Sequence, residues 1–87
     1  MTQITNIFIQ LNFDDCQELA NKNDSEGIFW LGYCYEHGIG VTKNVYKAFK
    51  YYQKAADMGH AAGVYNVGCC YENGIGVEID KNNAGKY

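Results

Sequence analysis

The chain has 87 residues, enough for one small domain, and it carries a formal net charge of −3 with no arginine. Its lysines are spread singly, so the basic footprint of a nucleic-acid-binding protein is missing and no nucleic-acid partner is expected. No segment approaches the roughly 20 apolar residues of a membrane span, and the first residues lack the basic and apolar regions of a secretory signal. These features predict a cytoplasmic protein without a membrane partner.

The N-terminal stretch, residues 1–23, predicts an amphipathic helix. Its apolar residues at helical spacing are Ile4, Ile7, Phe8 and Leu11. We expect the helix to continue toward Leu19 and Ala20 and to cover the unit that follows. A helix lying on a membrane surface is the alternative, but the Lys/Arg-rich polar face of such helices is absent.

Residues 24–59 predict two helices joined by a glycine-containing turn. The first helix, over 27–37, has apolar residues at helical spacing and should end at Gly38, because glycine accepts the left-handed conformation of a helix end. Asn44 is a typical N-cap residue and opens a second helix over 45–58. One face of this helix is apolar, and the other carries the lysines, which we expect in solvent: Lys47, Lys50 and Lys54.

The sequence pattern of this unit is repeated further along the chain. Leu31 to Val41 reads LGYCYEHGIGV, and 36 positions later Val67 to Val77 reads VGCCYENGIGV, with eight of eleven residues identical. Residues 60–87 therefore predict a second unit, with a helix over 61–73 and a second helix that begins near Lys81. Self-similarity at this period is typical of a solenoid, in which each unit buries its apolar face against the next.

The predicted fold class is therefore all-α: an α/α superhelix (solenoid) of antiparallel helix pairs in 36-residue repeats. We expect one complete repeat over 24–59 and a second repeat over 60–87 that is truncated in its second helix. Residues 1–23 then stand in the place of the second helix of a preceding repeat.

The glycine turn, the cap and the helix after them resemble the Sel1-like repeat, a relative of the tetratricopeptide repeat. The matching segments are Gly38-Ile39-Gly40-Val41, the cap Asn44, KAFKYYQKAA over 47–56 and Gly59. The resemblance covers roughly residues 24–87 and implies a non-catalytic module that mediates protein–protein contacts as an adaptor or scaffold. The same repeats also occur beside protein kinase domains. The alternative is therefore a repeat region of a larger signalling protein, such as a kinase with C-terminal repeats.

In tetratricopeptide-like solenoids the first helix of each unit lines the concave surface, so the resemblance implies a groove along these helices. The residues expected in this groove are Trp30, Tyr33, His37, Asn66, Cys69 and Asn73. Trp and Tyr are favoured at binding hot spots. The alternative for Trp30 and Tyr33 is packing against the N-terminal helix. The expected partner is a protein or peptide, and the open C-terminal face would permit self-association.

The cysteines predict neither a disulfide nor a metal site. Cys34 and Cys70 are one repeat apart, farther than the ~7 Å Cα separation that a disulfide allows, so we expect reduced thiols. Cys34 and His37 could supply two metal ligands from one helix. The second unit has Asn73 in place of the histidine, so a four-ligand zinc site is not expected.

No other residues predict chemistry. The glycine turn does not match the spacing of phosphate-binding loops. Glu36, its equivalent Glu72 and the loop residue His60 are expected in solvent. Because no nucleophile and base occur together, the sequence predicts no catalytic residues, no cofactor and no enzyme activity.

Overall fold

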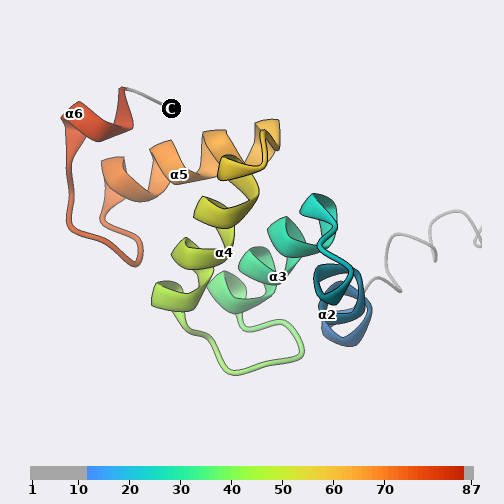
Figure 1. Cartoon of the computed structure of the whole chain (residues 1–87). Coiled ribbons are helices and arrows are strands. Elements are labelled where there is room, and N and C mark those ends of the chain that lie inside the picture. The colour runs from blue at the N-terminus through green and yellow to red at the C-terminus, as the bar shows by residue number, and fades with distance from the viewer. Residues whose placement is uncertain (1–11, 86–87) are drawn as a thin grey trace, which may run out of the picture.

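A computed structural model describes residues 12–85 of the chain. The helices of this part are α2 (Phe13–Asn21), α3 (Ser25–His37), α4 (Val45–Asp57), α5 (Ala61–Asn73) and α6 (Lys81–Ala84). Each helix packs chiefly on the helices next to it in the chain, so they form a row from α2 to α6 (Figure 1). This arrangement confirms the predicted all-α solenoid. Within residues 12–85, no helix has the length and apolar character needed to cross a membrane.

The start of α2 corrects the prediction of one long N-terminal helix. Asn12 is extended (φ −98°, ψ −177°), and its side chain accepts a hydrogen bond from the backbone N–H of Asp15 at 3.0 Å. The Asp15 carboxylate in turn accepts from the Asn12 N–H at 3.4 Å, which completes a capping box. A helix that continues through Asn12 is therefore wrong. The part expected from Ile4 to Leu11 lies outside the described residues.

The turns after α3 and α5 have the geometry that their glycines predict. Gly38 has φ 69° and its equivalent Gly74 has φ 70°, both left-handed, and each donates its N–H to a cysteine carbonyl in the preceding helical turn. Asn44 caps α4 and Asp80 caps α6. The two units therefore repeat the same local structure.

The helix contacts repeat as well. Gly27 of α3 lies against Leu19 of α2, and Gly63 of α5 lies against Ala55 of α4. A Cβ added at Gly63 would come within 2.9 Å of the Ala55 Cβ, closer than real Cβ atoms approach one another. The corresponding residues are 36 positions apart in both pairs. This correspondence supports the interpretation that α2 stands in the place of the second helix of a preceding repeat.

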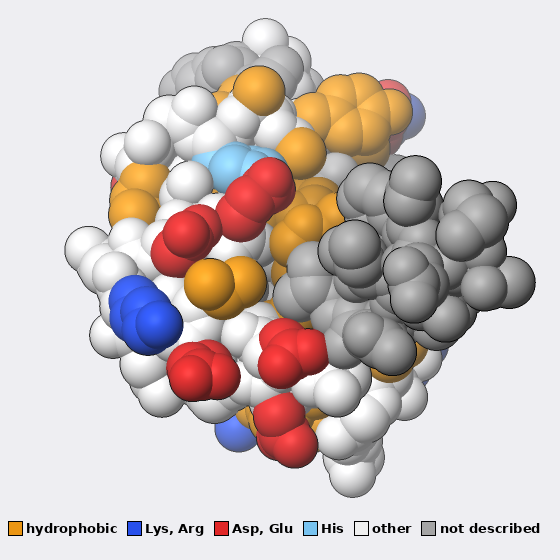
Figure 2. Space-filling model, turned by 90° about the vertical axis from the view of Figure 1, so that its right-hand side faces the viewer, with side chains coloured by type: hydrophobic (Ala, Val, Ile, Leu, Met, Phe, Trp, Pro, Cys, Tyr) orange, Lys and Arg blue, Asp and Glu red, His pale blue; other side chains and the backbone are white. Residues whose placement is uncertain are grey.

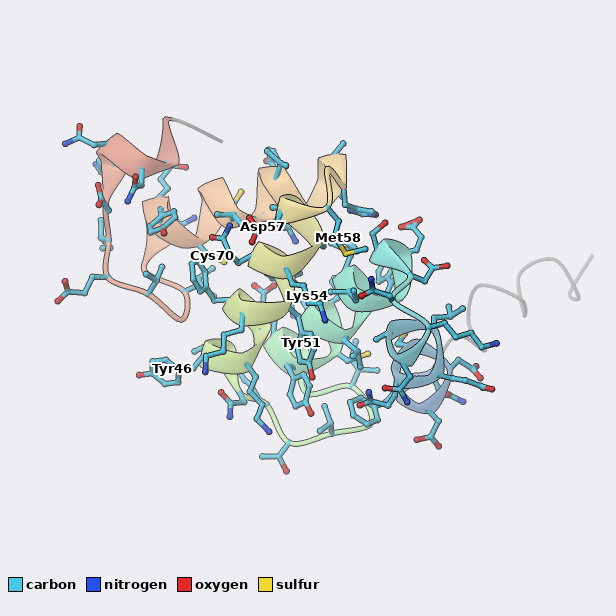
Figure 3. The ribbon with its side chains drawn as sticks, viewed as in Figure 1. Tyr46, Tyr51, Lys54, Asp57, Met58 and Cys70 are labelled. Carbon is cyan, nitrogen blue, oxygen red and sulfur yellow. The ribbon has the colours of Figure 1, made fainter. Side chains whose placement is uncertain are left out.

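The core follows the junctions between the helices. The buried residues between α3, α4 and α5 are Ile28, Phe29, Ala48, Tyr52, Ala55, Val67 and Cys70. Cys70 lies on the side of α5 that faces α4 (Figure 3). A smaller cluster of Cys16, Leu31 and Cys34 joins α2 to α3. All four cysteines of the chain are free, and burial raises the pKa of Cys16 to about 11 and that of Cys70 to about 12.

His60 joins the two units, so the prediction that it is a solvated loop residue is wrong. Its Nδ1 accepts a hydrogen bond from the Gly63 N–H at 3.1 Å and caps α5. Its Nε2 lies 2.8 Å from Oε1 of Glu26 in α3, and its ring stacks on Phe29 with the centroids 5.0 Å apart. Because Nδ1 is an acceptor here, neutral His60 carries its proton on Nε2 and donates it to Glu26. These contacts fix the start of α5 against α3.

Candidate functional site

Three of the residues expected in the groove form a continuous row on α3, which we call the aromatic row: Trp30, Tyr33 and His37. The Trp30 and Tyr33 rings meet edge to face with their centroids 5.2 Å apart, and the Tyr33 and His37 centroids are 4.4 Å apart. Trp30 and Tyr33 are each 37% exposed, so neither belongs to the core. Packing of either ring on the segment before Asn12 lies outside the described residues.

Two more of the expected residues, Asn66 and Cys69, line a cavity of ≈ 210 Å³ between α3, α4 and α5, which we call the Glu36 cavity. The rest of its wall consists of Glu36, Tyr52, Cys70 and Ile75. The buried Tyr52 donates its hydroxyl proton to Oε1 of Glu36 at 2.6 Å. Burial, followed by this bond to Glu36, raises the pKa of Tyr52, so its hydroxyl stays protonated and keeps the carboxylate in place.

His37 connects the aromatic row to the Glu36 cavity. Its Nε2 lies 3.7 Å from Oε1 of Glu36, the same oxygen that Tyr52 contacts. The row and the cavity thus meet at this contact, and we call the two together the groove surface. Its residues are Trp30, Tyr33, Glu36, His37, Asn66 and Cys69.

Asn73 is the one expected residue that does not reach this surface. Its side chain is exposed and is not part of the cavity wall. Its Nδ2 donates to the backbone carbonyl of Cys69 at 3.0 Å, on its own helix. We therefore place Asn73 at the margin of the groove surface.

The structure adds two residues that the sequence analysis missed, Glu36 and Tyr52. The expectation of a solvated carboxylate holds for the exposed Glu72 but is wrong for Glu36, which accepts a bond from a buried side chain. No signal within one helix distinguishes the two glutamates, because both lie in the last turn, near the negative end of the helix dipole.

Charge is segregated between the helices. α3 and α5 contain neither Lys nor Arg, and they carry the carboxylates Glu26, Glu36 and Glu72. α4 carries the exposed lysines Lys47, Lys50 and Lys54. Acidic side chains also gather on the α2 side of the molecule (Figure 2). The groove surface therefore lies on helices of negative charge, and the positive charge is concentrated on α4.

Chemically, the groove surface offers aromatic faces, a carboxylate and an amide. Among residues 12–85, no three His, Cys, Asp and Glu side chains are placed together so that they could hold a metal ion. The thiols of Cys34 and Cys70 both have a raised pKa because they are buried, and a protonated thiol is a poor nucleophile. Aromatic faces beside polar groups are suited to contact with another molecule.

A model of the Sel1 repeat matches residues 25–60 and 61–87. The chain belongs to the Sel1 repeat family. Sel1 repeats are protein-interaction modules, and proteins built from them are generally non-catalytic helical scaffolds.

Solved structures of Sel1 repeat proteins share the fold. Cysteine rich protein B of Helicobacter pylori is 31% identical with a TM-score of 0.79, over 85% of this chain and 56% of that one. A protective antigen of uropathogenic Escherichia coli with an SLR fold is 30% identical with a TM-score of 0.79. The match covers 84% of this chain and 16% of the antigen. A Sel1 repeat protein from Oxalobacter formigenes is 31% identical with a TM-score of 0.73. The match covers 86% of this chain and 37% of that protein.

Curated relatives match over a shorter stretch. The chain is 51% identical over 37 residues to DAP3-binding cell death enhancer 1 of Rattus norvegicus and 49% identical to the protein of that name in Mus musculus. The match covers 42% of this Sel1 repeat chain and only 7% of each relative.

Proposed function

We propose that this Sel1 repeat chain is a non-catalytic adaptor or scaffold module whose groove surface binds a segment of a protein partner. The observation that carries the proposal is the continuity of the aromatic row with the Glu36 cavity through His37. Trp and Tyr supply large contact areas and are the residue types most enriched at binding hot spots. The cavity beside them provides polar groups that give a bound segment its orientation.

The comparisons support this proposal at the level of the family. The rat and mouse relatives are named as DAP3-binding proteins, which agrees with a role in protein binding. The alternative of a repeat region appended to a protein kinase is not supported by the matches reported above.

A second copy of the chain is the other candidate partner. Tyr65 and Ile79 near the C-terminal end are 70% and 63% exposed. A cavity of ≈ 310 Å³ opens between α5 and α6 beside Tyr65. Self-association through this face would bury apolar surface that the described residues leave in contact with solvent. Sedimentation over a range of concentrations tests it, since a chain that stays monomeric at all of them contradicts this candidate.

The groove proposal is tested by recovery of the native partner from cells with tagged variants of the chain. Truncation of a hot-spot side chain to Ala weakens binding by about 2 kcal/mol or more, so Tyr33→Ala and Asn66→Ala should lose the partner. Lys50→Ala, on the exposed face of α4, is the matched control and should retain it. All three variants must keep the helical circular dichroism of the parent chain. Loss of the partner in Lys50→Ala alone contradicts the proposal.

A further inference from the structure

We propose that the partner segment inserts a lysine or arginine side chain into the Glu36 cavity. The inference rests on the proposed function, because it names the chemistry of the segment that the groove surface binds. Four features of the structure support a cation at this position: the fixed carboxylate, the size and lining of the cavity, the aromatic row beside it, and the charge of the surrounding helices.

The carboxylate of Glu36 is held in place before any partner binds. The Tyr52 hydroxyl donates to its Oε1 at 2.6 Å, and Tyr52 itself is fully buried. Within residues 12–85, the contact of His37 with Glu36 also goes to Oε1, which leaves Oε2 to a ligand. A carboxylate that is already oriented loses little freedom when it accepts a hydrogen bond from a cation.

The cavity has room for a cationic group. Its ≈ 210 Å³ is many times the roughly 10–15 Å³ that a cavity needs to hold one water molecule. Asn66 and Cys69 stand in the wall together with Glu36. The Asn66 side-chain oxygen can accept a second hydrogen bond, so an ammonium or guanidinium group finds both a charge partner and a neutral acceptor.

The aromatic row gives a cationic side chain a surface next to the carboxylate. Trp30 and Tyr33 are partly exposed, and the row reaches Glu36 through His37. The hydrocarbon part of a lysine or arginine side chain packs well on such rings, and the faces of Trp and Tyr attract the charge itself. A carboxylate in the partner would lack the attraction between its charge and the ring faces.

Two of the three helices around the cavity favour the same sign of ligand charge, since α3 and α5 contain no Lys or Arg. The third helix, α4, lines the cavity with Tyr52, and its lysines are exposed and do not belong to the cavity wall. Glu36 lies in the last turn of α3 and Cys70 in the last turn of α5, where the helix dipole places partial negative charge. In the second unit, the equivalent Glu72 lines a cavity together with Lys81 of this same chain. A basic partner segment is therefore complementary to this surface, and an acidic segment is repelled.

Short peptides that differ at one position test the inference on the full chain. The probes are acetylated Gly-Ser-Leu-Xaa-Leu-Ser-Gly amides in which Xaa is Lys, norleucine or Glu. Their binding is followed by amide NMR of the isotope-labelled chain. We expect the lysine peptide to shift the amide signals of Glu36 and Asn66 and to bind about tenfold more tightly than the norleucine peptide, with the glutamate peptide weakest.

A charge-neutral variant assigns this preference to the cavity. Gln at position 36 can still accept the Tyr52 hydrogen bond but carries no charge, so Glu36→Gln should lose most of the tenfold preference for the lysine peptide over the norleucine peptide. Lys50→Gln is the matched control and should keep the tenfold preference. On the unchanged chain, added salt should reduce the lysine preference because it screens the ion pair, and this measurement does not depend on the folding of any variant.

The results separate the inference from the proposed function. The cation inference is overturned by equal binding of the lysine and norleucine peptides to the unchanged chain. It is also overturned by an undiminished lysine preference in Glu36→Gln, or by the absence of any amide shift in α3 and α5 with all three peptides. The groove proposal is then still judged by recovery of the native partner with Tyr33→Ala and Asn66→Ala. Conversely, the proposed function is overturned if the chain prefers the lysine peptide while Tyr33→Ala and Asn66→Ala both recover the partner fully. The cation inference still holds in that case.

Discussion

The two repeat units have nearly the same sequence pattern but different surroundings. Phe29 in α3 is 7% exposed because α4 and His60 of the next unit cover it, whereas its equivalent Tyr65 in α5 is 70% exposed. Leu31 and its equivalent Val67, in contrast, are both fully buried. In a solenoid, burial thus depends on which neighbours a position has as well as on residue type. Leu31 and Val67 pack toward the helix that precedes their own, whereas Phe29 is covered by α4 and His60, which follow it in the chain.

Alanine at the equivalent positions Phe29 and Tyr65 gives the largest expected difference between the units. Phe29→Ala removes a core ring and should lower the free energy of unfolding by about 3–5 kcal/mol. Tyr65→Ala removes a mostly exposed ring and should change it by no more than about 0.5 kcal/mol. Urea unfolding of both variants measures the contrast. Equal losses of unfolding free energy in the two variants would show that Tyr65 is covered by an interaction such as self-association. Unfolding at several protein concentrations detects such an interaction.

Replacing the turn glycines should destabilise both units, because both positions have the left-handed backbone conformation. Gly38→Val and Gly74→Val place a β-branched residue at φ 69° and 70°, and each should destabilise the chain by about 1–2 kcal/mol. Gly85, at φ −69°, is the control, since alanine there needs no change in the backbone. Thermal melting compares the three variants. If both valine variants melt at the same temperature as the parent chain, the turns do not require glycine.

The buried thiols predict how stability depends on pH. Burial raises the pKa of Cys16 to about 11 and that of Cys70 to about 12, from an ordinary value of 9.0. Above about pH 9, the unfolded chain loses thiol protons that the folded chain retains, so the free energy of unfolding should fall as the pH rises toward 11. Urea unfolding at several pH values measures this slope, and Cys16→Ala should make it shallower. Constant stability over this range, or a rise, contradicts burial of these thiols.

Among the helices, α6 should be the least protected from amide hydrogen exchange. This helix has four residues and no buried side chain, and a helix so short has little stability without packing. Its amides should exchange with solvent at nearly the rate of an unfolded chain, whereas amides of α3 should exchange only on global unfolding. Hydrogen exchange followed by NMR distinguishes the two helices. Equal protection of α6 and α3 would mean that the second unit is as complete as the first.

Local signals in the sequence predicted much of the fold. The helix over 61–73 and the cap Asn44 were predicted as observed, and Gly38 ends its helix in the left-handed conformation, as its equivalent Gly74 does. These features depend on residues within one or two turns of one another. The repeat pattern and the family resemblance supplied the order in which the helices pack.

The cavity could not be predicted in the same way. The bond from Tyr52 to Glu36 and the contact of His60 with Glu26 join side chains 16 and 34 residues apart. Whether such residues meet depends on the rotation and separation of helices, which no spacing within a single helix encodes. For this reason the sequence placed Trp30, Tyr33 and Asn66 in the groove but left Glu36 and His60 in solvent.

Trp30 allows the most direct test of the groove, because it is the only tryptophan of the chain and lies in the aromatic row. Titration of a tryptophan-free partner segment should change the Trp30 emission and saturate at the concentration at which calorimetry shows saturation of binding. Lys50→Ala should give the same curve. Full-affinity binding by calorimetry with unchanged Trp30 emission would contradict the account, because the partner would then occupy a different surface.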